Sequence, residues 1–144
     1  MEKKVQFRDR QELQSADLNA IQTYAADSLQ HLTQDAVSAG LAYTGGLVAA
    51  ASATEITVAP LRFYNDGKCY VAEDSQTLNL FQYIPLVTKK IVALVVFGQE
   101  TDTNVEPRDF LIDLTTGATQ PSAVAMQLLR AANVTLLPGA ESAD

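Results

Sequence analysis

The spacing of apolar residues changes once along this chain of 144 residues, and that change limits what the chain can fold into. From Leu18 to Ala36 the apolar residues recur every three or four positions, so they fall within roughly 80° of arc on one side of a helix. Beyond residue 54 the apolar runs are short and rich in β-branched and aromatic residues, as strands are. We therefore predict an α+β fold, with a long N-terminal helix followed by a mainly antiparallel β-domain.

The helix is expected over residues 15–39, because Ser15 is a good N-cap and Gly40 a good C-terminal stop. At this length it spans ~37 Å and needs a long partner surface, from its own domain or from another copy of the chain. Residues 1–14 are polar with scattered apolar positions and predict an extended arm. We assign residues 1–40 to an arm and helix for attachment and oligomerisation. The apolar stripe by which the helix is expected to pack consists of Leu18, Ile21, Ala25, Leu29, Leu32 and Ala36.

The β-domain is expected over residues 41–138. Residues 40–54, around its start, are rich in glycine and small residues and predict a loop or a loosely packed lead-in to the sheet. Asp66-Gly67 predicts a tight hairpin turn, because both residues tolerate positive φ angles. Residues 90–99 are apolar on both faces, which predicts a central strand covered on both sides.

The end of the β-domain contains one clear strand and one ambiguity. Residues 121–138 suit either a helix or a strand, and the neighbouring hairpins favour a strand only slightly. Pro138-Gly139 is expected to end the domain and to leave residues 139–144 as a linker or tail. Residues 108–114 predict a separate strand that packs its apolar face on the core, through Phe110, Ile112 and Leu114.

Composition argues against several classes of partner. The formal net charge of −7 does not suit nucleic acid, whose phosphates demand a basic surface. The longest apolar run, at residues 91–97, is far shorter than the ~20 residues of a membrane span, so no membrane insertion is expected. The single cysteine, Cys69, allows no intrachain disulfide, which fits folding in a reducing cytoplasm.

The segment 98–117 concentrates acidic residues: Glu100, Asp102, Glu106, Asp109 and Asp113. Their spacing matches no calcium-binding loop. The first three are expected on a polar connection ended by Pro107, and the last two on one strand face. We expect these acids to be solvated or to meet basic groups of a neighbouring subunit. The residues expected to make polar contacts between subunits are Glu106, Arg108, Asp109 and Asp113. The alternative is a metal-dependent hydrolase that uses Asp102 and Glu106.

No set of acid, base and nucleophile emerges from the sequence. His31 is the only histidine and is flanked one turn away by Asp27 and Asp35, which is more often a solvated helix face than a metal site. Cys69 has no second cysteine and no identifiable base, and no phosphate-binding glycine motif is present. We therefore expect no catalytic residue, metal or cofactor, and predict an assembly or binding module rather than an enzyme.

Two stretches resemble tail-fibre and baseplate proteins of tailed bacteriophages: VQFRDRQELQSADLNAIQTYA at 5–25 and VFGQETDTNVEPRDFLIDLTTGATQPSAVAMQ at 96–127. The resemblance implies a virion structural protein, made in the host bacterial cytoplasm, that docks on other tail or baseplate proteins as a homo-oligomer, with a trimer favoured. The arm would then bind the partner through Phe7, Arg8, Asp9, Arg10 and Leu13. The alternative is a disordered N-terminus, as chain termini usually are.

A second function remains open from the sequence. A host-surface or carbohydrate-binding β-module would present exposed aromatic side chains on a sheet face. The candidates for such a surface are Tyr64, Tyr70, Phe81 and Tyr83.

Overall fold

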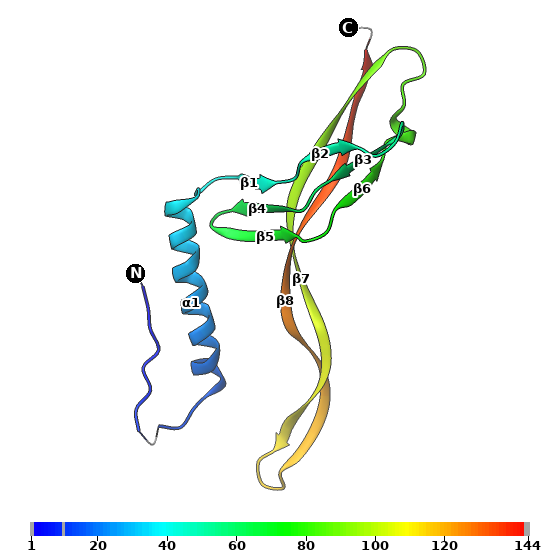
Figure 1. Cartoon of the computed structure of the whole chain (residues 1–144). Coiled ribbons are helices and arrows are strands. Elements are labelled where there is room, and N and C mark those ends of the chain that lie inside the picture. Colours follow the sequence, from blue (N-terminus) through cyan, green and yellow to red (C-terminus); the bar gives the residue numbers. More distant parts are fainter. Residues whose placement is uncertain (1, 10, 143–144) are drawn as a thin grey trace.

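The computed structural model describes residues 2–9 and 11–142. An extended arm leads into helix α1 (Ser15–Ala36), and strands make up the rest of the chain, so the predicted α+β fold is confirmed (Figure 1). The helix is bounded slightly differently from the prediction. Its N-cap is Gln14, whose backbone N–H donates to the Asp17 carboxylate at 3.2 Å, and its C-cap is Val37.

The first six strands form a meander that is folded into two short sheets. The meander runs back and forth three times, and each run is broken into two short strands, one in each sheet. The first break is at Gly45-Gly46, whose φ angles are +80° and +70°. Residues 40–54, predicted to be a loop or a loosely packed lead-in, contain the first two strands, because backbone pairing alone holds their small residues in the sheets. The elements are β1 (Ala42–Gly45), β2 (Val48–Ala50), β3 (Glu55–Val58), β4 (Leu61–Asn65), β5 (Lys68–Ala72), β6 (Gln76–Asn79) and the 3-10 helix η1 (Phe81–Tyr83).

The last two strands form a long antiparallel ribbon that continues far beyond the meander (Figure 1). They are β7 (Lys89–Asp113) and β8 (Ala118–Ser142), of 25 residues each. The sheet orders are β1-β4-β5-β8-β7 and β2-β3-β6. Between β5 and β8 the only residue pair is Val71 with Ala131, so the meander and the ribbon share a very short seam.

A small core lies between the meander and one face of the ribbon near that seam. Tyr70 is central to it, because its ring lies directly over Gly98 of β7, where an added Cβ would approach three ring atoms to 2.6–2.7 Å. Leu94, Val96 and Val134 of the ribbon pack against this core. Its buried members are Val58, Leu61, Phe63, Tyr70, Ala72 and Ala132.

The tight turn at Asp66-Gly67 is confirmed, with φ of 50° and 72° at its two residues. Residues 90–99 form a strand as predicted, but the prediction that this strand is central is wrong. They belong to β7, an edge strand, and the described chain covers only one of their faces. Apolar residues on both faces favour burial on both sides, but in the described chain Ile91 and Phe97 on the outer face stay exposed.

The strand predicted at residues 108–114 is confirmed for 108–113, but these residues are the end of β7 rather than a separate strand. The apolar alternation there does not reach the core, and Leu114 at the ribbon tip is 91% exposed. No polar connection precedes this segment either. Pro107 lies within β7 opposite Ala123, and Pro121 of β8 lies opposite Asp109.

The ambiguity at residues 121–138 is resolved as strand. Of the predicted linker, residues 139–142 instead continue β8, with Glu141 opposite Lys90, and residues 143–144 lie outside the described part. A register shift between Lys90 and Val92 allows β8 to continue past Pro138, because a proline is tolerated beside a bulge.

Candidate functional site

The N-terminal arm packs along one side of α1. Glu2 Oε1 lies 2.7 Å from His31 Nδ1 and also accepts a hydrogen bond from the Ser28 hydroxyl, while Lys3 Nζ lies 5.7 Å from the centre of the Tyr24 ring. Hydrogen bonds from Ser28 and His31 hold the pKa of Glu2 below its ordinary value. His31 is therefore engaged by the arm rather than by an acidic ladder.

The predicted partner-binding residues of the arm are exposed. Phe7 and Leu13 are both on the surface, as are Arg8 and Asp9, whereas Arg10 lies outside the described residues. The predicted stripe of α1 is exposed along its whole length, from Leu18 through Ala36. The described chain therefore leaves both surfaces available to other molecules.

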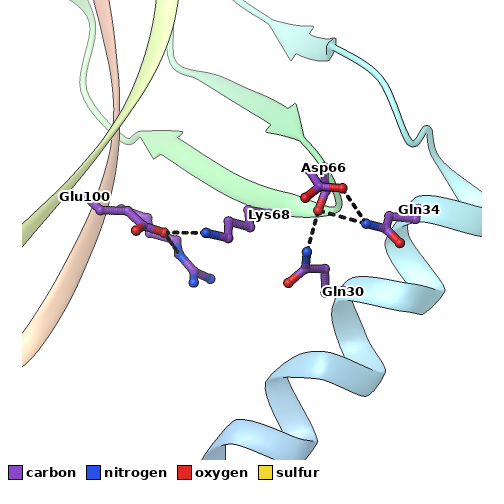
Figure 2. A network of polar contacts seen from close by, with 6 residues as sticks. Gln30, Gln34, Asp66, Lys68 and Glu100 are labelled. Carbon is purple, nitrogen blue, oxygen red and sulfur yellow. Dashed lines mark hydrogen bonds and ion pairs between the residues drawn. The ribbon is translucent and has the colours of Figure 1, made fainter. Parts of the chain in front are cut away.

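The other side of α1 contacts the β4–β5 turn, as Figure 2 shows. The amide group of Gln30 donates to the Asp66 carbonyl oxygen at 2.7 Å, and that of Gln34 donates to the Asp66 carboxylate at 2.7 Å. Gly67 lies so close to the helix that a Cβ would approach Gln34 Cγ to 2.7 Å. The turn therefore needs glycine both for its positive φ and for this close approach.

Where the ribbon leaves the meander, one carboxylate joins three strands (Figure 2). Glu100 of β7 accepts hydrogen bonds from Arg130 of β8 at 2.9 Å and from Lys68 of β5 at 3.3 Å. The hydrogen bond from Arg130 and, after it, the one from Lys68 hold the pKa of Glu100 below its ordinary value. Glu100 thus ties the root of the ribbon to the meander.

The predicted inter-subunit polar residues lie on the ribbon beyond this point. Arg108 donates to Glu106 at 2.7 Å within the chain, and Asp109 is exposed. The Asp113 carboxylate accepts the backbone N–H groups of Thr115 and Thr116 in the turn at the tip, which lowers its pKa. Contacts of these residues with a neighbouring subunit stay a prediction.

The acidic residues of segment 98–117 are distributed along the ribbon rather than gathered. In residues 2–9 and 11–142, no group of three or more histidine, cysteine, aspartate or glutamate side chains is arranged to hold a metal ion. Within that part of the chain, no helix is both long and apolar enough to cross a membrane.

The candidate aromatic residues are also scattered. Tyr70 belongs to the core, Tyr64 and Tyr83 are partly buried, and Phe81 is exposed on η1. The contact of Tyr70 with Gly98 was not foreseen from the sequence. An isolated glycine within a strand pattern is the signal that indicates such a close approach.

Searches against protein-family models, curated proteins and solved structures found no match.

Proposed function

We propose that this chain is a virion structural protein of a phage tail, baseplate or tail-fibre attachment module, which acts by assembling with other proteins. In this role it forms a homo-oligomer, with three copies preferred, and docks on other tail or baseplate proteins. The arm and α1 serve attachment, and the β-domain forms the body. The two stretches that resemble phage tail proteins motivate the class of particle.

The observation that supports an assembly role is the surface area of the isolated chain. Its accessible surface is 10980 Å², whereas a folded monomer of 15.5 kDa has about 7,200 Å². Much of the excess is apolar, on the stripe of α1 and along the ribbon. A large apolar surface on a soluble protein marks an interaction site, so this chain is built to be covered by partners.

Immunogold electron microscopy tests the proposal on phage particles released by the strain that encodes the chain. Antibodies against the purified chain are expected to label the tail or its tip. Label on the head, or label at background level on particles whose proteins include the chain, would overturn the assignment to the tail.

A further inference from the structure

The two faces of the ribbon differ in charge over most of their length. Directly opposed residues of an antiparallel pair share a face, so the register assigns every residue to one side. The odd-numbered residues from Ala93 to Pro107 of β7 oppose the odd-numbered residues from Leu137 to Ala123 of β8. These residues, eight from each strand, include no charged side chain, and we call them the uncharged face.

The opposite face packs on the core near the meander and carries both charged and apolar side chains beyond it. Its charged side chains are Glu100, Asp102, Glu106, Arg108 and Arg130. The cleft between α1 and the sheet is lined by Arg130, so the helix lies on this charged side. The uncharged face is therefore directed away from both the core and the helix.

None of the sixteen residues of the uncharged face is buried in this chain. Among its apolar members, Phe97, Val105, Leu129 and Leu137 are strongly exposed. Its amide side chains partly satisfy each other, because Asn133 donates to Gln99 at 3.1 Å. The face extends over about 48 Å at ~3.4 Å per residue. A two-stranded ribbon of this kind is marginally stable in water unless a face is covered.

We propose that the uncharged face packs against the same face in other copies of this chain and forms the interior of the homo-oligomer. This inference rests on the homo-oligomer of the proposed function and names its interface. Each copy carries a formal net charge of −7, so copies repel one another over most of their surface. A face without charges is where they meet without that repulsion and without burying an unpaired charge.

The exposed area of the chain is consistent with burial in an assembly. The chain exposes about 3,800 Å² more than a folded monomer of its mass. This excess is spread over the stripe of α1 and both faces of the ribbon, and the uncharged face contributes part of it. Face-to-face packing of ribbons ~10 Å apart also supplies the second cover that the apolar residues of β7 require.

Two neighbouring leucines provide a matched test. Leu129 lies on the uncharged face and is 53% exposed in the chain, and Leu128 lies on the charged face and is 54% exposed. Sedimentation equilibrium of the purified full chain compares Leu129→Lys with Leu128→Lys, with circular dichroism as the check on folding. We expect Leu129→Lys to raise the concentration needed for association at least about a hundredfold, because it would bury an unpaired charge in the interface. We expect Leu128→Lys to leave that concentration nearly unchanged.

The inference is overturned if the wild type is monomeric at all concentrations, if both variants associate like the wild type, or if both dissociate alike. Should Leu129→Lys fail to fold, cysteine labelling replaces it. In a Cys69→Ser background, maleimide is expected to react much more slowly with Leu129→Cys than with Leu128→Cys, and equal rates contradict the proposal. These measurements need no virion, so their failure is separate from a failure to find the chain on phage tails.

Discussion

Replacing Gly98 by alanine tests the contact that fixes the ribbon to the core. The new Cβ would lie 2.6–2.7 Å from Cγ, Cδ1 and Cδ2 of Tyr70. These atoms are close to the root of a buried side chain, so the ring cannot move aside without disturbing the core. Overpacking of this kind costs about 1–3 kcal/mol of unfolding free energy.

A smaller effect opposes this cost. Alanine restricts the unfolded chain more than glycine does and so stabilises by about 0.4–1 kcal/mol where the backbone suits it. The net expectation for Gly98→Ala is a loss of about 1–2 kcal/mol, which lowers the Tm by roughly 3–6 °C for a chain of this size. Differential scanning calorimetry measures the change, at one fixed protein concentration because association also affects the Tm.

Gly40→Ala is the matched control. Its Cβ would approach nothing closer than Ser38 Oγ at 3.6 Å, so its Tm should stay the same or rise slightly. The contact with the ring is isolated by repeating Gly98→Ala in a Tyr70→Ala background, where it should cost little. The reasoning fails if Gly98→Ala leaves the Tm unchanged, or if it costs as much without the ring as with it.

Two further predictions concern the elements attached to this core. Gly67→Ala should lower the unfolding free energy by more than ~1 kcal/mol, because its φ is positive and its Cβ would overlap Gln30, and it should speed hydrogen exchange in α1. Gly117→Ala, with φ +71° and no neighbour within 4 Å, is the control for backbone strain alone. Equal losses of unfolding free energy in the two variants would exclude a role for the helix contact. The lowered pKa of Glu100 means that its ionised form favours the folded state. Its contribution is therefore fully present above the ordinary pKa of 4.5 and is lost as the pH falls through the lower folded-state value. The Tm gap between the wild type and Glu100→Gln should therefore be largest at pH 7 and narrow as the pH falls below 4.5, and a constant gap would contradict this.

Local signals in the sequence were sufficient for the helix and the first hairpin. The stripe from Leu18 to Ala36 predicts α1 because helical periodicity needs no knowledge of the partner. Asp66-Gly67 predicts its turn for a similar reason, since the required backbone angles are a property of those two residues.

The ribbon was less predictable because its apolar residues do not say what covers them. The alternation of Phe110 and Ile112 correctly indicates a strand, but core and interface residues alternate in the same way. Residues 121–138 suit a helix or a strand locally, and only the pairing with β7, distant in sequence, makes them a strand. The candidate site was missed for the same reason, because the uncharged face appears only once the two strands are aligned.

The two prolines of the distal ribbon have a consequence for the fidelity of folding. Pro107 and Pro121 both occupy odd-numbered pairs of the ladder. A proline lacks an N–H group and fits a strand only where its nitrogen points out of the ladder. After a slip by one residue, odd-numbered residues of β7 would oppose even-numbered residues of β8, so one of the two proline nitrogens would point into the ladder and the side chains of one strand would change face. A hairpin misaligned by one residue would therefore lose a ladder hydrogen bond and mix charged with uncharged side chains on each face, so the prolines favour the native register over these two neighbouring ones.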